Sequence, residues 1–235
     1  MVIFGQTISE LFLQIVQKDK QVLESLSIMI YSSRLCLVKV ESTPNNLAII
    51  QVYIPTTKAN DEEVEEVYVG IEGVLKHTKP HDNVIIMGDL NAIVGENREG
   101  REVGDFCLGK RNERIERVVE FCRENRMIIT STRFQNPKRR IYTWKIPGDI
   151  ARYQIDYILV KNRFKNQVTF CKAYLSADCD SDHNLVIAKC ELRYTKPQRP
   201  KVHQEKYSVR LPKRAEVVEQ YGRYMDIEYQ KEKCR

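Results

Sequence analysis

The chain has 235 residues, 42% of them hydrophobic and 30% charged, which is enough for one ordinary domain with an appendage and for a packed core. No apolar run reaches the roughly 20 residues that a membrane helix needs, and the first residues lack the basic segment of a secretory signal, so we expect no membrane contact. The net charge of +6 is compatible with a polyanionic partner but does not establish one.

In chain order, the first predicted element is a helix at Ile8–Leu26, because apolar residues recur there at three- and four-residue steps. We interpret it as a helix docked on a core, and a partner-binding helix is the alternative. Two paired strands are predicted next, at Leu35–Val40 and Leu47–Tyr53, with the turn-forming cluster Ser42–Asn46 between them. A helix over Asp61–Lys76 follows, with its acidic residues at the start, where the helix dipole favours them.

The second half of the sequence continues this alternation. Val84–Met87 is wholly apolar, which is typical of a strand buried on both faces, and a helix is predicted at Arg111–Asn125. Further strands are predicted at Met127–Thr130, Ile141–Trp144, Gln154–Val160 and Leu185–Leu192. The pattern favours a layered α/β domain on mixed sheets. It divides the chain into a segment at 1–26, a domain at 27–194, and a basic linker with a charged tail at 195–235.

Seven cysteines are scattered along the chain without a Cys-x-x-Cys pair. An odd number at such spacings favours neither a disulfide framework nor a zinc ribbon. We interpret them as reduced thiols, nearly all of them small core residues, in an intracellular protein of the nucleus or the cytoplasm.

Polar residues follow the apolar run Val84–Met87. Asp89 and Asn91 are two residues apart, so an extended backbone would direct both side chains to the same side. A carboxylate and an amide suit a hard cation or a phosphate oxygen. An Asp/Asn turn after a strand explains this pair equally well.

A second polar group is predicted around the last two strands. Asp156 is a lone acid in an apolar strand, and a buried carboxylate is costly without a partner. Asp182 and His183 stand immediately before the final strand. Asp182 could be a metal ligand, and His183 a proton-carrying or phosphate-binding imidazole whose tautomer Asp156 fixes.

Basic and aromatic residues alternate between Lys138 and Trp144. Lys138, Arg139 and Arg140 could neutralise phosphates, while Trp144 could stack on a base or wedge against it. A solvated loop that leads into a strand explains the same residues equally well. The motifs of phosphate-loop NTPases, α/β-hydrolases and zincins are absent from the sequence, so those enzyme classes have no support.

Five short segments, in order along the chain, resemble the endonuclease/exonuclease/phosphatase superfamily. They are Gln51–Thr56, Gly88–Ala92, Tyr142–Trp144, Gln154–Leu159 and Ser181–His183. Within that superfamily the chain is similar to craniofacial development protein 2-like sequences and to the endonuclease domains of LINE-type retrotransposons, over about residues 27–194. The resemblance implies a four-layer sandwich of two mixed β-sheets flanked by helices, with a site that hydrolyses phosphate esters, here DNA phosphodiesters, using Mg²⁺ or Mn²⁺.

The resemblance also implies a role for each site residue. Asp89 would activate or orient the attacking water, Asn91 would bind the phosphate or the metal, and Asp182 would be a metal ligand. Because in-line displacement needs a placed water and a cation that neutralises developing charge, these residue types suit the reaction. The resemblance further implies that His183 would hydrogen-bond the phosphoryl oxygens while Asp156 holds it.

Tyr53 would, by the same resemblance, lie near the scissile phosphate. One part of the superfamily pattern is missing: a first strand ending in Asn and a second strand ending in the Glu that is the chief metal ligand. The predicted helix at Ile8–Leu26 stands in their place, so we expect a sandwich without its first strands and without one carboxylate.

Two hypotheses follow from this departure. The first is a metal-dependent endonuclease with a rebuilt metal site. The second is a catalytically impaired remnant that binds nucleic acid or protein. The sequence leaves open which of them is correct, the choice between DNA and RNA, and the oligomeric state.

Overall fold

The computed structural model describes residues 2–4, 26–96, 100–146, 148–175 and 182–192. The chain divides into two units, Met1–Lys196 and Pro197–Arg235, and all of the described residues belong to the first. Most of the helix that we predicted at Ile8–Leu26 lies outside the described residues, as does the predicted tail. Leu26 itself opens a strand, so the helix prediction is wrong at that residue.

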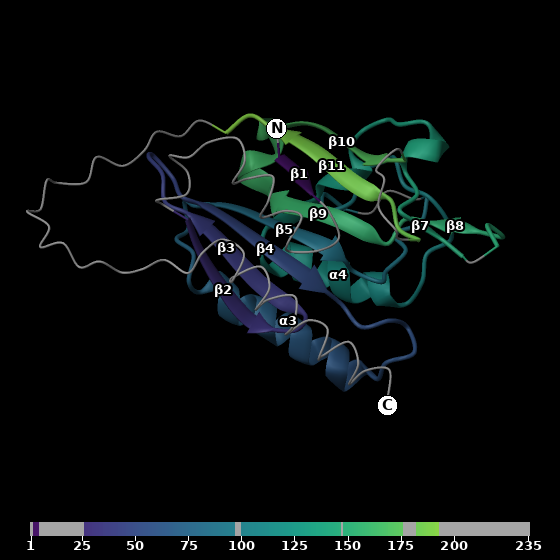
Figure 1. Cartoon of the computed structure of the whole chain (residues 1–235), viewed down its shortest axis with the longest axis horizontal. Coiled ribbons are helices and arrows are strands. Elements are labelled where there is room, and N and C mark those ends of the chain that lie inside the picture. Colours follow the sequence, from purple (N-terminus) through teal and green to yellow (C-terminus); the bar gives the residue numbers. More distant parts are fainter. Residues whose placement is uncertain (1, 5–25, 97–99, 147, 176–181, 193–235) are drawn as a thin grey trace, which may run out of the picture. The chain divides into compact units, whose positions relative to one another are not determined.

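The larger sheet has six strands and contains the elements that carry the site (Figure 1). Their order is β2 (Leu26–Ser32), β3 (Leu35–Val40), β4 (Leu47–Tyr53), β5 (Asn83–Asp89), β9 (Asp156–Lys161) and β6 (Met127–Ile129). Strands β4 and β5 are parallel, and the other pairs are antiparallel, so the sheet is mixed. The central strands are rich in branched residues and buried on both faces, as the sequence of β5 predicted.

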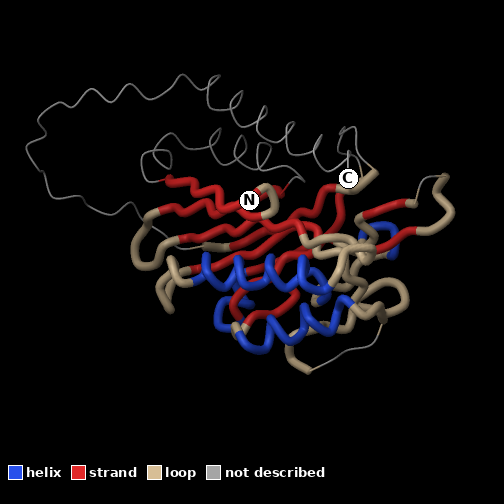
Figure 2. Tube along the Cα trace, turned by 90° about the horizontal axis from the view of Figure 1, so that it is seen from below, coloured by secondary structure: helices blue, strands red, loops and turns tan. Residues whose placement is uncertain are grey.

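Two helices cover one face of this sheet (Figure 2). Helix α3 (Asp61–Leu75) begins after Asn60, whose side chain accepts a 2.8 Å hydrogen bond from the backbone N–H of Glu63. Helix α4 (Arg114–Glu124) packs beside it, and Arg117 of α4 binds Glu65 of α3 through two 2.8 Å hydrogen bonds. Both helix predictions are confirmed to within three residues at each end.

A second, three-stranded sheet packs on the opposite face. Its order is β1 (Val2–Phe4), β11 (Leu185–Cys190) and β10 (Val168–Tyr174), all antiparallel. The layer between the sheets is apolar: Met87 and Ile158 of the larger sheet belong to the same core cluster as Val186 and Ala188 of β11. Two sheets with flanking helices confirm the predicted α/β class. Strand β1 was not predicted, because we expected the first strands to be missing.

Other differences from the prediction concern individual strands. Strands β2 and β10 were not predicted, and the prediction of a strand at Ile141–Trp144 is wrong. There, only Trp144 is in a strand, within the hairpin of β7 (Trp144–Lys145) and β8 (Arg152–Tyr153). The remaining elements are three 3₁₀-helices, η1 (Thr130–Thr132), η2 (Lys138–Arg140) and η3 (Asn162–Gln167). No helix in the described ranges is long and apolar enough to cross a membrane.

Candidate active site

Three predicted site residues lie in register across three neighbouring strands. Tyr53 at the end of β4 is the partner of Asp89 at the end of β5, and Asp89 is the partner of Asp156 at the start of β9. Residues paired in register present their side chains on the same face of a sheet. The strand pairing therefore brings together two carboxylates and a tyrosine that are far apart in the sequence.

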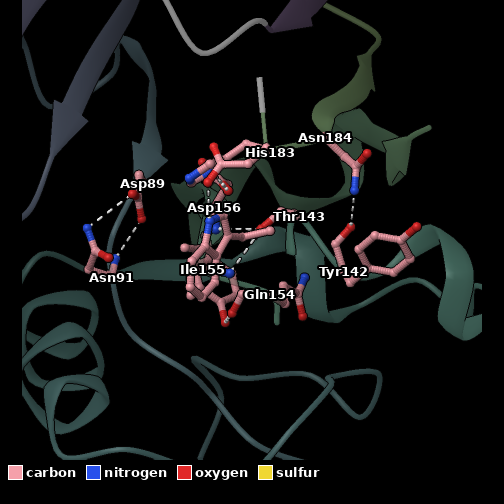
Figure 3. Close-up of polar contacts among 12 residues, drawn as sticks. Asp89, Asn91, Tyr142, Thr143, Gln154, Ile155, Asp156, His183 and Asn184 are labelled. Carbon is pink, nitrogen blue, oxygen red and sulfur yellow. Dashed lines mark hydrogen bonds and ion pairs between the residues drawn. The ribbon is translucent and has the colours of Figure 1, made fainter. Parts of the chain in front are cut away.

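The end of β5 and the residues that follow it fix Asp89 through unusual backbone geometry. Gly88 has φ +143°, and a Cβ there would lie 1.8 Å from the carbonyl oxygen of Val52 in β4. Asn91 has φ +46°, a region that Asn tolerates better than most residues. Its backbone N–H and its side-chain amide donate to the two oxygens of Asp89, at 2.9 and 3.0 Å, and the amide also donates to the carbonyl of Ile54 at 2.8 Å. Asn91 therefore holds the Asp89 carboxylate in one orientation (Figure 3).

His183 reaches the same place from the other sheet. Its Nδ1 lies 3.0 Å from Oδ2 of Asp156, the partnership that the sequence suggested. Thr143 supports both residues: its hydroxyl accepts hydrogen bonds from the backbone N–H groups of Ile155 and Asp156, and its carbonyl accepts one from Asn184 at 2.6 Å (Figure 3). Thr143 is buried and joins the start of β9 to the start of β11, a role that we did not predict for it. The sequence did offer a signal for this role, because Thr143 is the middle residue of the Tyr142–Trp144 motif.

Asp182 and Trp144 form a second polar pair beside the histidine. The indole Nε1 of Trp144 donates a 2.7 Å hydrogen bond to Oδ2 of Asp182, and the Trp144 ring stacks on Tyr153 with centroids 6.0 Å apart. Trp144 also forms an isolated β-bridge with His183. The exposed carboxylate of Asp182 is thereby held at the rim of the site.

These side chains line two adjoining cavities. The first, of about 280 Å³, is lined by Asp89, Asp156, Asp182 and His183, with Gln51 among its other residues. The second, of about 520 Å³, has a more aromatic wall. Its lining includes Tyr53, Asp89, Asn91, Trp144, Tyr153 and His183. Every residue to which we assigned a catalytic or metal role borders at least one of the two cavities.

The predicted nucleic-acid residues are only partly brought together. Trp144 lines the second cavity, whereas Lys138, Arg139 and Arg140 form the 3₁₀-helix η2 and line neither of the two. Lys138 lies 3.8 Å from Glu96 in a solvent-exposed ion pair, which contributes little to stability.

Burial and neighbouring charge change how the site titrates. Burial, and then the negative charge of Asp156, raise the pKa of Asp89 to about 7, despite the hydrogen bonds from Asn91. Burial lowers the pKa of His183, but the hydrogen bond and charge of Asp156 outweigh it, so the net shift is upward. Near neutral pH, Asp89 is therefore able to accept a proton and His183 is more readily protonated than a free imidazole.

The side chains around the first cavity carry the kind of ligand atoms that a hard cation prefers. Asp89, Asp156 and Asp182 offer oxygens, and no cysteine lines this cavity. The buried Oε1 of Gln51, at the same cavity, has no hydrogen-bond partner among the described residues. Within the described ranges, however, no group of three or more His, Cys, Asp or Glu side chains is placed to hold a metal ion. Mg²⁺ or Mn²⁺ would therefore keep several of its waters here or take a neutral oxygen ligand in place of one of them.

Comparison with a solved structure identifies the class of fold. The endonuclease domain of TRAS1, a telomere-specific non-LTR retrotransposon, matches with a TM-score of 0.53 and 14% identity, over 72% of this chain and 70% of that one. This likeness concerns the fold alone. Together with the paired sheets, it shows that the described unit has the fold of the endonuclease/exonuclease/phosphatase class.

Sequence comparison then identifies particular relatives. Over 162 residues, 69% of the chain, it is 43% identical to craniofacial development protein 2 of Bos taurus. It is 40% identical over the same length to craniofacial development protein 2 of Tragulus javanicus. The chain is a homologue of craniofacial development protein 2 over this stretch, and it spans 27% and 28% of the lengths of those two relatives. No protein-family model matches the chain.

Proposed function

We propose that the chain is a metal-dependent phosphodiesterase that cleaves DNA by in-line attack of an activated water. The observation that carries this proposal is the convergence of Asp89, Asp156, Asp182 and His183, from two sheets, on one cavity. The fold shared with the endonuclease domain of TRAS1 supports the same reaction class by analogy only.

Asp89 is the residue best suited to orient the water and take its proton. Its carboxylate is held by Asn91 beside both cavities, and the charge of a bound cation would keep it ionised, which is the form that accepts a proton. His183 is held through Nδ1 by Asp156, so Nε2 is the nitrogen that would donate to a phosphoryl oxygen. The upward shift of its pKa favours that donation.

The cation is assigned to Asp182, Asp89 and Asn91. Mg²⁺ or Mn²⁺ would, when bound, neutralise the charge that develops on the phosphate. Tyr53, which is 38% exposed and lines both cavities, would contact the scissile phosphate. Trp144 in the second cavity would stack against a base of the DNA.

Nicking of a supercoiled plasmid tests the proposed reaction. We expect relaxation of the plasmid in Mg²⁺ or Mn²⁺, much less in Zn²⁺, and none in excess EDTA, because oxygen donors prevail at the site. The measurement is the fraction of nicked circle over time on a gel, with added Mg²⁺ restoring the EDTA-treated sample. Cleavage that persists in EDTA would show that the mechanism does not use a metal.

Binding to DNA is expected to weaken steeply with salt. Each phosphate contact made by Lys138, Arg139 or Arg140 releases counterions, so replacing all three with Gln should lower the slope of log affinity against log salt by roughly one per residue. Fluorescence anisotropy with a labelled duplex between low and physiological salt measures this slope. An identical slope in the wild-type protein and the triple variant would mean that η2 is solvated and makes no contact with the DNA phosphates.

The second candidate function is a binding module derived from such an endonuclease. It is favoured by the lack, within the described ranges, of three acidic, histidine or cysteine side chains placed around one metal position. The two functions separate in a single experiment: a module of this kind would bind DNA or a protein in EDTA yet cut DNA with none of the three metals.

A further inference from the structure

One polar side chain lies in an otherwise apolar row of the larger sheet. Gln51 in β4 is paired in register with Cys36 of β3 and Met87 of β5, and Met87 is paired with Ile158 of β9. Cys36, Met87 and Ile158 are buried in the core cluster between the two sheets. Gln51 is thus the polar member of a row that otherwise continues the core.

The carbonyl oxygen of Gln51 is unfavourable for folding in this position. Oε1 is buried, and no hydrogen bond reaches it from the part of the chain that the structure describes. A buried acceptor without a donor costs free energy, whereas methionine has almost the same length and would fill the same space without that cost. The folded structure alone gives no reason for an amide here, which points to a use in binding.

The position of Gln51 places that oxygen beside the acidic residues. Gln51 and Tyr53 are two apart in β4, so their side chains leave the same face of the sheet. Tyr53 is in register with Asp89, which puts Gln51 about 7 Å further along the strand, deeper between the two sheets. Gln51 lines the same 280 Å³ cavity as Asp89 and Asp182.

We propose that Gln51 supplies an oxygen ligand to the divalent cation, directly or through a water of its hydration shell. This inference rests on the proposed metal-dependent function. A carboxamide oxygen is an acceptable ligand for Mg²⁺, which commonly keeps several of its waters. As a neutral ligand, Gln51 gives a weaker site than a carboxylate at the same place would.

Three variants test this role by metal binding instead of by cleavage. Gln51→Met removes the oxygen and keeps the length, and Gln51→Glu supplies a carboxylate. Asn83→Leu is the matched control, because the buried Oδ1 of Asn83 also has no partner, and Asn83 lies at the opposite end of β5 from Asp89. The measurements are calorimetric titration with Mg²⁺ and Mn²⁺, and the melting temperature of each protein with EDTA and with metal.

We expect Gln51→Met and Asn83→Leu both to melt a few degrees above the wild-type protein in EDTA. Only Gln51→Met should bind Mg²⁺ at least tenfold more weakly, while Gln51→Glu should bind it about tenfold more tightly and melt lower in EDTA.

Wild-type affinity in Gln51→Met overturns the inference and leaves the proposed function intact. If none of the four proteins binds either metal, the proposed function itself fails. If Gln51→Glu does not fold, the comparison of Gln51→Met with Asn83→Leu still decides.

Discussion

Replacing Gly88 with alanine is expected to destabilise the protein by roughly 3 kcal/mol or more, the largest stability effect that we expect for any single substitution. A Cβ at this position would lie 1.8 Å from the carbonyl oxygen of Val52. This oxygen belongs to the backbone of the neighbouring strand, so it cannot move aside as a side chain could. The φ of +143° adds strain, because residues with a side chain rarely adopt it. Relief requires β4 and β5 to separate, and this would also displace Asp89.

Gly73→Ala provides the matched control for Gly88→Ala. Gly73 lies within helix α3, and nothing would come within 4 Å of its added Cβ. Because alanine favours the helix over glycine, this variant should be more stable by up to about 1 kcal/mol. Thermal or urea unfolding of both variants measures the difference. If Gly88→Ala unfolds at the wild-type midpoint, β4 and β5 do not approach each other at Gly88 as closely as the structure shows.

His183→Ala is expected to reduce DNA cleavage by about 10²- to 10³-fold, the range typical of losing one hydrogen-bond donor to the charge that develops in the transition state. The imidazole lines both cavities and is the protonatable donor that Asp156 holds by a 3.0 Å contact. His81→Ala is the control, since His81 is exposed in the loop before β5, at the end of the strand opposite Asp89. That variant should cut at the wild-type rate.

The Asp156→Asn variant tests whether Asp156 only positions His183 or also takes part directly in the cleavage reaction. If Asp156 acts by holding His183, the double variant Asp156→Asn/His183→Ala should cut no more slowly than His183→Ala alone. The measurement is the nicking rate of the four proteins in Mg²⁺, with circular dichroism to show that each is folded. Losses that multiply in the double variant would mean that Asp156 acts on the reaction independently of the histidine.

The sequence was most informative where a periodic pattern and a uniform environment coincide. Helix α3 buries Val64, Tyr68, Ile71 and Val74, spaced so that they share one face of the helix. Residues Val84–Met87 of strand β5 are all apolar because both faces of the strand are covered there. Other strands gave no such signal. Strand β2 was missed because Leu26 also continued the predicted helical pattern, although in the structure Leu26 and Ile28 pack between the sheets.

The sequence by itself determined which residue types stand at the strand ends, and thereby the candidates Asp89, Asn91, Asp156 and His183. Side-chain alternation along an extended strand predicted that Asp89 and Asn91 share a side, but Asn91 has φ +46° and lies beyond the strand, so their contact is the Asp/Asn turn that the sequence left as the alternative. The sequence also suggested a partner for Asp156, since a buried carboxylate needs one.

Only the tertiary structure decided which distant groups meet. The contact between Asp156 and His183 spans 27 residues and the hydrogen bond from Trp144 to Asp182 spans 38, so both depend on how elements far apart in the chain pack together. The unpaired oxygen of Gln51 likewise follows from strand register, because a polar residue in an apolar strand can equally well face solvent. Local sequence pattern specifies each element, whereas the chemistry of the site depends on packing between elements far apart in the chain.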